Sequence, residues 1–225
     1  MSVVCITGGA TGLGKEIARK LLPDHTVIIY SLDNDELKAT GKELGCDVIG
    51  GDVMDHAGIE KALKDVVKKH GSVDVFVNNA GLWIEGSLEE NDPEYIHKVM
   101  EVNAIGPILC SRAVLPIMKK QKSGLIFNVI SKNGLETGTN RSVYNASKWA
   151  MTGFTRCLQD DTKGTNIRVT GFYPGRIDTP LYESAGAQSK PEQSMTAKDV
   201  ATVVVDIINR PDNLIIREVG IVANV

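Results

Sequence analysis

The chain has 225 residues, of which 42% are hydrophobic and 24% charged, and its formal net charge is −3 at pH 7. This length and composition predict one soluble domain, residues 1–225, with a core large enough to fold without further support. The weak negative charge provides no basic field that would attract nucleic acid or an anionic membrane surface.

Short apolar runs alternate with longer amphipathic segments along the chain. Strands are predicted at 3–7, 26–32, 46–50, 73–78, 124–130, 167–172 and 214–222. Helices are predicted at 13–22, 35–44, 56–70, 92–120, 143–161 and 197–209, with kinks at Pro107 and Pro116 in the fourth. This alternation predicts a doubly wound α/β fold of about seven parallel strands with helices on both faces.

A glycine-rich turn joins the first predicted strand to the first helix, with the sequence Thr7-Gly8-Gly9-Ala10-Thr11-Gly12-Leu13-Gly14. Gly8 permits a tight turn, Gly12 lets the backbone approach a pyrophosphate, and Gly14 allows the helix to pack closely. The helix N-terminus would then face the anion. A glycine-rich turn alone is a weak signal, because it also occurs as a simple strand-to-helix connection.

A Tyr-x-x-x-Lys pair, Tyr144 and Lys148, follows Ser131 by thirteen residues. In a helix, residues four apart lie on one face, so the phenol and the ammonium would enter the same space. A cation there favours the phenolate, and we expect the pKa of Tyr144 to be lowered from about 10 toward working pH. Taken singly, each of the three residues also fits an ordinary structural role.

Further blocks in the same order complete a pattern: Asp52-Val53, Asn78-Asn79-Ala80-Gly81, Asn103 and Pro174-Gly175-x-Ile177-x-Thr179. From residue 3 to about residue 180 the chain resembles the short-chain dehydrogenase/reductases of the single-domain, short-subunit type. The resemblance implies a Rossmann-type fold and hydride transfer between a nicotinamide cofactor and a secondary alcohol or ketone.

The resemblance implies roles for particular residues. Tyr144 would be the general acid or base and Lys148 would tune it and bind the nicotinamide ribose, while Ser131 steadies the substrate oxygen and Asn103 holds a relay water. The implied cofactor-binding residues are Gly8, Thr11, Gly12, Leu13, Gly14, Ser31, Asp33, Asp52, Val53, Asn79, Ala80, Gly81, Tyr144, Lys148, Pro174, Gly175, Ile177 and Thr179. The implied substrate residues are Trp83, Asn133, Leu135 and Tyr182, with a substrate lid at 181–195.

Two of these residues have an alternative explanation. Asp52 could instead cap the helix that begins near His56. Trp83 could pack in the core or at an interface between subunits. Both alternatives remain open at the level of the sequence.

The end of the second strand bears on the choice of cofactor. A carboxylate there hydrogen-bonds the ribose 2′-hydroxyl of NAD, whereas an Arg pairs with the 2′-phosphate of NADP. No Arg or Lys occurs from Thr26 through Glu36. The family's Asp position aligns with Ser31, and Asp33 lies two residues further on. The missing cation favours NAD over NADP.

Three functions are considered. The first is an NAD(P)-dependent oxidoreductase, and the second a non-catalytic nucleotide-binding regulator or scaffold with the same fold. A sugar-nucleotide epimerase or dehydratase shares Tyr-x-x-x-Lys, but no room remains after Thr179 for its added substrate domain.

Features that the sequence lacks bear on the location of the protein and on the ligands it could bind. The apolar runs fall short of the ~20 residues of a membrane span, and the glycines at 8 and 9 interrupt any signal peptide, so a cytoplasmic location away from membranes is expected. The four cysteines are scattered without metal-ligand spacing, so no metal site is predicted. We expect a small-molecule alcohol or carbonyl substrate, no nucleic acid partner, and a homodimer or homotetramer formed through the two long helices.

Overall fold

The computed structural model describes residues 1–182 and 194–224. Seven strands form its main sheet: β1 (Val3–Thr7), β2 (Thr26–Ser31), β3 (Asp47–Gly50), β4 (Val75–Asn78), β5 (Gly124–Val129), β6 (Ile167–Pro174) and β9 (Glu218–Ile221). The α-helices are α1 (Gly12–Leu21), α2 (Asp35–Leu44), α3 (His56–His70), α4 (Pro93–Met100), α5 (Gly106–Gln121), α6 (Ser142–Asp161) and α7 (Ala197–Ile208). Short elements complete the described part: the 3₁₀ turns η1 (Leu88–Glu90) and η3 (Lys132–Gly134), the π-helical turn η2 (Glu101–Ile105), and a ladder of β7 (Ile177–Asp178) with β8 (Met195–Thr196).

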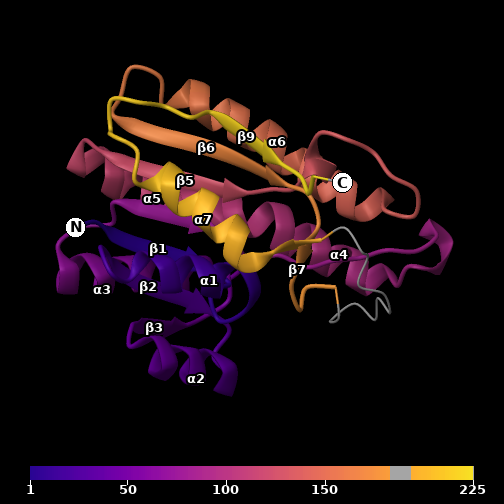
Figure 1. Cartoon of the computed structure of the whole chain (residues 1–225), viewed down its shortest axis with the longest axis horizontal. Helices are drawn as coiled ribbons and strands as arrows, with labels where there is room; N and C mark the ends of the chain where they lie inside the picture. Colours follow the sequence, from indigo (N-terminus) through magenta and orange to yellow (C-terminus); the bar gives the residue numbers. More distant parts are fainter. Residues whose placement is uncertain (183–193, 225) are drawn as a thin grey trace.

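The main sheet has the order β3-β2-β1-β4-β5-β6-β9, and neighbouring strands are parallel throughout. Figure 1 shows this order, with β9 and β6 at one edge and β2 and β3 at the other. The order reverses between β1 and β4, and open α/β sheets bind ligands beyond the carboxyl ends of the strands at such a switch point. The predicted doubly wound fold is confirmed.

Each face of the sheet carries its own apolar core, because successive side chains of a buried strand point to opposite faces. Ile6 and Ile29 pack with α1, α2 and α7 on one face. Cys5 and Ile28 pack with α3 and α5 on the other. The strands are apolar at consecutive positions since both of their sides are covered.

Two strands are shorter than predicted by two or more residues. The segment predicted as a strand at 214–222 pairs with β6 only from Glu218 onward, and Leu214 and Ile215 before it are exposed. β4 begins at Val75 rather than at residue 73, and the two residues before it form side-chain as well as backbone hydrogen bonds. The backbone N–H of Val73 donates to Gln121, and the carboxylate of Asp74 accepts from the backbone N–H of Val3.

The helix predicted at 92–120 is interrupted by the π-helical turn η2, and the backbone N–H of Gly106 donates to the carbonyl of Glu101. The cause lies in the next residue. Pro107 has no N–H, so it cannot donate to the carbonyl of Asn103 as an α-helix requires. The irregularity therefore surrounds Asn103, where a kink was predicted.

The combined helix Pro93–Gln121 is the one described helix that is long and apolar enough to cross a membrane by length and composition. Its second part, α5, packs against the sheet through Cys110, Val114 and Met118, each fully buried. These three residues thus belong to the apolar core between α5 and the sheet.

Candidate active site

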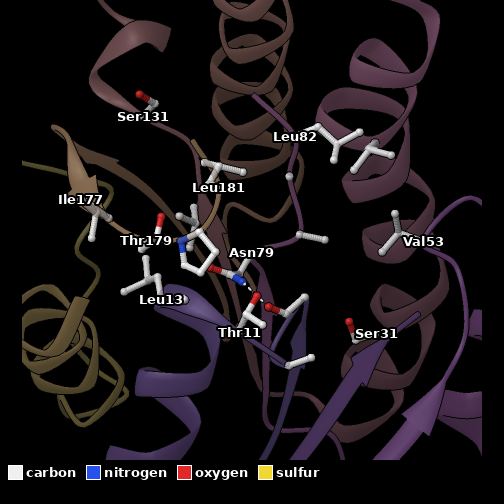
Figure 2. Close-up of a pocket in the computed structure, with 18 of the residues that line it drawn as sticks. Thr11, Leu13, Ser31, Val53, Asn79, Leu82, Ser131, Ile177, Thr179 and Leu181 are labelled. Carbon is white, nitrogen blue, oxygen red and sulfur yellow. Dashed lines mark hydrogen bonds between the residues drawn. The ribbon is translucent and has the colours of Figure 1, made fainter. Parts of the chain in front are cut away.

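A cavity of about 680 Å³ lies beyond the carboxyl ends of the strands, at the switch point. It extends from the glycine-rich turn to Ser131, Tyr144 and Lys148, and it is lined by loops that follow β1, β2, β3, β4, β5 and β6. Figure 2 shows Thr11 and Ser31 on one side of it and Ser131 and Leu181 on another. All of the predicted cofactor residues except Gly14 and Asp33 line this cavity.

The glycine-rich turn takes its shape from backbone that only glycine adopts readily. Gly8 and Gly12 have φ angles of 63° and 52°. A Cβ on Gly8 would lie 2.8 Å from the Cα of Ala80. The Asn79 side chain donates to the carbonyls of Thr7 and Gly8 at 3.0 and 3.1 Å, so the loop after β4 is tied to the turn after β1.

The N-terminus of α1 is suited to an anion. Its N-cap residue, Thr11, forms no side-chain hydrogen bond to the first turn, and that turn contains no acidic residue. In α2 and α3, by contrast, Asn34 and Asp55 accept from first-turn backbone N–H groups. The free N–H groups of α1 and its dipole therefore face the cavity, as the binding of a pyrophosphate requires.

Asp33, which was predicted to bind the cofactor at the end of β2, does not line the cavity. Leu32, Asn34 and Glu36 line the cavity together with Ser31, whereas Asp33 does not. The carboxylate of Asp33 pairs with Lys38 at 3.4 Å, and its Cβ lies against Gly50 of β3. At the end of β2, the acidic side chain that lines the cavity is thus Glu36, in the first turn of α2.

Asp52 lies in the cavity wall beside Val53. One of its carboxylate oxygens accepts from the backbone N–H of Met54 at 2.9 Å. The N-cap of α3 is Asp55, which accepts from the backbone N–H of Gly58. The alternative that Asp52 caps this helix is therefore wrong.

Tyr144 and Lys148 lie one turn apart on the buried face of α6, with residue exposures of 5% and 6%. The Lys148 Nζ atom is 5.5 Å from the centroid of the Tyr144 ring. Ser131 lines the same end of the cavity, and its side chain lowers the pKa of Tyr144. Ser131, which lies thirteen residues before Tyr144, is thus at the same end of the cavity as the Tyr144 and Lys148 pair.

The pKa of Tyr144 differs from the expectation. Burial raises this pKa above its ordinary value, and the neighbouring Tyr182 raises it further, while the hydrogen bond from Ser131 and the charge of Arg141 lower it. Burial also lowers the pKa of Lys148 to about 8. The expected acidic phenol was wrong because desolvation outweighs the attraction of nearby positive charge.

Asn103 lies in the π-helical turn beside the cavity, 1% exposed, and does not line it. Its side chain accepts from the backbone N–H of Leu82 at 2.7 Å and donates to the carbonyl of Leu82 at 2.9 Å. It also donates to the Ser147 hydroxyl, which in turn donates to the carbonyl of Tyr144. Asn103 therefore connects the loop after β4 to the helix that carries Tyr144.

The four predicted substrate residues lie in different surroundings. Tyr182 lines the cavity, whereas Trp83, Asn133 and Leu135 do not. Trp83 is 3% exposed and packs between the rings of Tyr144 and Tyr182, with centroid distances of 4.3 and 4.9 Å. Asn133 is buried in η3, and Leu135 is exposed on the surface. Of the predicted lid at 181–195, residues 183–193 lie outside the described residues.

The structure places several residues in or beside the site that the sequence motifs did not indicate. Besides Glu36, Lys98 and Val102 line the cavity from the helix before Asn103, and their spacing of four residues is a signal that could have found them. Ser147, which bonds Asn103, lies within the Tyr-x-x-x-Lys segment but carried no separate expectation. Across the described residues, no group of three or more His, Cys, Asp or Glu side chains could hold a metal ion.

Comparisons with known proteins agree with this geometry. A family model described as short chain dehydrogenase matches residues 2–190. The 2-dehydro-3-deoxy-L-rhamnonate dehydrogenase (NAD(+)) of a Sphingomonas species is 33% identical over 183 residues, covering 79% of this chain and 73% of that protein.

Solved structures resemble the whole fold. The alcohol dehydrogenase of the archaeon Thermococcus sibiricus, complexed with 5-hydroxy-NADP, is 28% identical with a TM-score of 0.89, covering 99% of this chain and 97% of that one. A serine dehydrogenase complexed with NADP+ is 27% identical with a TM-score of 0.90, covering 97% and 94%.

Proposed function

Because the chain belongs to the short-chain dehydrogenase family, we propose that it transfers a hydride between a nicotinamide dinucleotide and a secondary alcohol or ketone. One observation carries the proposal: Ser131, Tyr144 and Lys148 meet at one end of a single cavity that begins at the glycine-rich turn. The cavity thus joins a place for a dinucleotide to groups that hold and move a proton.

The residues of the cavity fit a dinucleotide. The uncapped N-terminus of α1 would hold the pyrophosphate, and Asp52 and Val53 would contact the adenine. Lys148 would bind the nicotinamide ribose, and the loop of Pro174, Gly175, Ile177 and Thr179 would cover the nicotinamide. When bound, the nicotinamide supplies the hydride or accepts it at its C4 atom.

The protein's own residues would handle the proton. In reduction, Tyr144 donates its phenolic proton to the carbonyl oxygen; in oxidation, it accepts the hydroxyl proton. Ser131 hydrogen-bonds the same oxygen and orients it. The Lys148 ammonium stabilises the phenolate that reduction leaves behind.

Asn103 would act at the far side of Lys148. Its side chain holds the loop at Leu82, and Pro107 leaves its backbone carbonyl without an α-helical donor. A water bound at that carbonyl would relay protons between Lys148 and solvent.

We propose NAD as the preferred cofactor. Leu32 and Glu36 line the end of the cavity at β2, where a 2′-phosphate would need a cation. The Sphingomonas relative is described as using NAD(+), whereas the two structural relatives are complexed with NADP or an NADP derivative. A kcat/KM for NADPH equal to or above that for NADH would reject this preference.

We also propose a cytoplasmic homodimer formed through α5 and α6. An apolar groove of about 320 Å³ lies between these helices and is lined by Ile108, Leu115, Pro116, Phe154 and Leu158, among others. Ile105, directly before α5, and Trp149 of α6 are also exposed. A second copy of the chain would cover these side chains.

A panel of secondary alcohols and ketones, assayed with NADH, NADPH and their oxidised forms, tests the proposed reaction. Tyr144→Phe removes the proton donor and keeps the ring, so turnover should fall by about 10³-fold or more while dinucleotide binding, followed by cofactor fluorescence, stays unchanged. Unchanged turnover in Tyr144→Phe would contradict the proposal. Tight nucleotide binding with no turnover on the panel would favour the alternative, a non-catalytic nucleotide-binding regulator.

A further inference from the structure

The position of Ser131 depends on a short turn that a single side chain ties to α6. Ser131 begins the 3₁₀ turn η3, and its carbonyl accepts from the backbone N–H of Gly134 at 2.9 Å. Its hydroxyl oxygen accepts from the backbone N–H of Asn133 at 3.1 Å. The far end of the turn is therefore coupled to the Ser131 hydroxyl through two short hydrogen bonds.

Thr152 holds that far end. Its hydroxyl donates to the carbonyl of Gly134 at 2.9 Å and lies 3.2 Å from the carbonyl of Lys148, one turn earlier on α6. Thr152 is 2% exposed, so water does not replace these contacts. The Thr152 hydroxyl thus contacts both the turn that begins at Ser131 and the backbone of Lys148. The Lys148 side chain in turn lies over the Tyr144 ring.

The approach is close because residue 134 is a glycine. A Cβ on Gly134 would lie 2.7 Å from the Thr152 Oγ1 atom and 2.9 Å from the Lys148 carbonyl oxygen. Any larger residue would push the turn away from α6.

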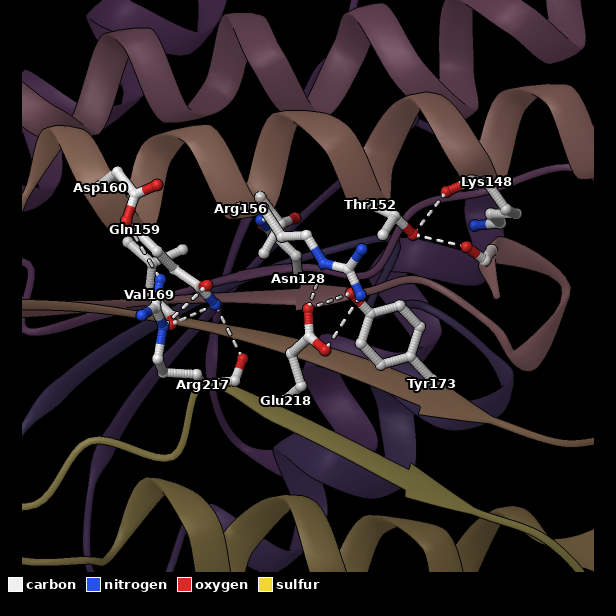
Figure 3. Close-up of polar contacts among 12 residues, drawn as sticks. Asn128, Lys148, Thr152, Arg156, Gln159, Asp160, Val169, Tyr173, Arg217 and Glu218 are labelled. Atoms are coloured by element: carbon white, nitrogen blue, oxygen red, sulfur yellow. Dashed lines mark hydrogen bonds and ion pairs between the residues drawn. The ribbon is translucent and has the colours of Figure 1, made fainter. Parts of the chain in front are cut away.

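A separate set of polar contacts joins α6 to the edge of the sheet at β6 and β9. The Tyr173 phenol of β6 donates to the Glu218 carboxylate of β9 at 3.3 Å. Arg156 holds that carboxylate through two contacts, at 2.7 and 3.2 Å. Figure 3 shows the contact of Thr152 with Lys148 and, separately, the contacts of Glu218 with Arg156 and Tyr173.

We propose that Thr152 is a positioning residue that holds the Ser131 hydroxyl at the distance from Tyr144 which the proposed hydride transfer requires. The inference rests on the proposed function. Thr152 itself acts only through the turn, because it does not line the cavity. Its loss should therefore lower kcat and leave dinucleotide binding unchanged.

Thr152→Val keeps the shape of the side chain and removes the hydroxyl, while Thr152→Ser keeps the hydroxyl. Thr155→Val is the matched control, because Thr155 is equally buried on α6 but its hydroxyl accepts from Asn128 of β5, away from the turn. Both valine variants lose one buried hydrogen bond, so similar losses of thermal stability are expected.

We expect kcat to fall about 10-fold or more in Thr152→Val and to stay within about 2-fold of the parent in Thr152→Ser and Thr155→Val. Hydrogen exchange of the amides at Asn133 and Gly134 should be faster in Thr152→Val alone.

Equal kcat values in Thr152→Val and Thr155→Val, or a Thr152→Ser variant as slow as Thr152→Val, would overturn the inference. If Thr152→Val does not fold, Gly134→Ala is the second variant, because its added Cβ would push the turn away from Thr152 and α6. It should show the same loss of kcat with unchanged dinucleotide affinity. A parent protein that turns over no substrate would reject the proposed function instead, and the inference with it.

Discussion

The Nζ atom of Lys148 lies 5.5 Å from the centroid of the Tyr144 ring, and both residues are almost completely buried. The ammonium is therefore placed over the ring, in a region where burial works against charge on either residue. Burial raises the pKa of Tyr144 and lowers that of Lys148 to about 8. Tyr144 therefore stays protonated at neutral pH, and Lys148 loses its charge near pH 8.

The rate of ketone reduction should therefore depend on pH through Lys148. Tyr144 stays protonated and ready to donate, so kcat/KM for reduction should be flat from pH 6 to about 7.5. Above about pH 8 the neutral amine no longer stabilises the phenolate, and the rate should fall. Lys148→Arg, which keeps its charge, should be slower but lack this decrease. A profile of the parent that stays flat to pH 10 would contradict the prediction.

Lys148→Met should stabilise the fold while abolishing turnover. The folded-state pKa of about 8 lies below the ordinary 10.5, so below pH 8 the folded protein bears the whole cost of the buried ammonium. The variant should gain up to about 3 kcal/mol in the free energy of unfolding at pH 7. This gain should shrink as pH rises from 8 to 10.5, because the parent then loses the charge. Urea unfolding at pH 7 and pH 10 measures the difference; a variant less stable than the parent at pH 7 would show that Lys148 holds the fold.

Gly8→Ala should disrupt the turn that ends β1. Gly8 has a φ of 63°, and a new Cβ would lie 2.8 Å from the Cα of Ala80, which is backbone that cannot move aside cheaply. Gly45→Ala is the control, since Gly45 has a φ of 65° with no atom within 4 Å of the added Cβ. Both variants bear the cost of the left-handed backbone, about 1–2 kcal/mol. Gly8→Ala should lose a further ~1–3 kcal/mol and its dinucleotide binding, whereas Gly45→Ala should keep binding. Equal stabilities in thermal unfolding would count against the predicted collision.

Leu32→Arg should shift the cofactor preference toward NADPH. Leu32 lines the cavity at the end of β2 and is 58% exposed, so a guanidinium there can reach a 2′-phosphate without burial. The ratio of kcat/KM for NADPH to that for NADH should rise by about 10-fold or more. Lys38→Arg keeps the charge at a position that pairs with Asp33 and should leave the ratio unchanged. If Leu32→Arg had the same NADPH-to-NADH ratio of kcat/KM as the parent, the ribose 2′-position of the cofactor would not lie near residue 32.

Ile108→Glu should weaken the proposed dimer. Ile108 is 38% exposed and lines the apolar groove between α5 and α6, so a carboxylate there would be buried by a second copy. Light scattering after gel filtration should show a dimer for the parent and a monomer for this variant. Leu214→Glu, at an exposed position outside the groove, should leave the mass unchanged. A monomeric parent would remove the proposal.

The order of elements and the membership of the site were largely predictable from the sequence. Strand and helix alternation is a local property, and the strands at 3–7, 26–31 and 124–129 fall within one or two residues of the expected bounds. The Tyr144 and Lys148 pair meets because helical periodicity alone brings residues four apart together. Pro107 likewise predicted an irregular helix, since a missing N–H acts within its own segment.

Other features were decided by packing between distant segments. The sequence offers two carboxylates after β2, Asp33 and Glu36. Glu36 lines the cavity, whereas Asp33 pairs with Lys38 and lies against Gly50. Trp83 was predicted to contact substrate, but the rings of Tyr144 and Tyr182 enclose it. The pKa of Tyr144 depends on how much water the whole fold excludes, which no motif encodes. Local spacing thus determined which chemical groups this protein brings to one edge of its sheet, whereas burial and long-range contacts, which depend on every element at once, decided which way each group faces and how firmly it holds its charge.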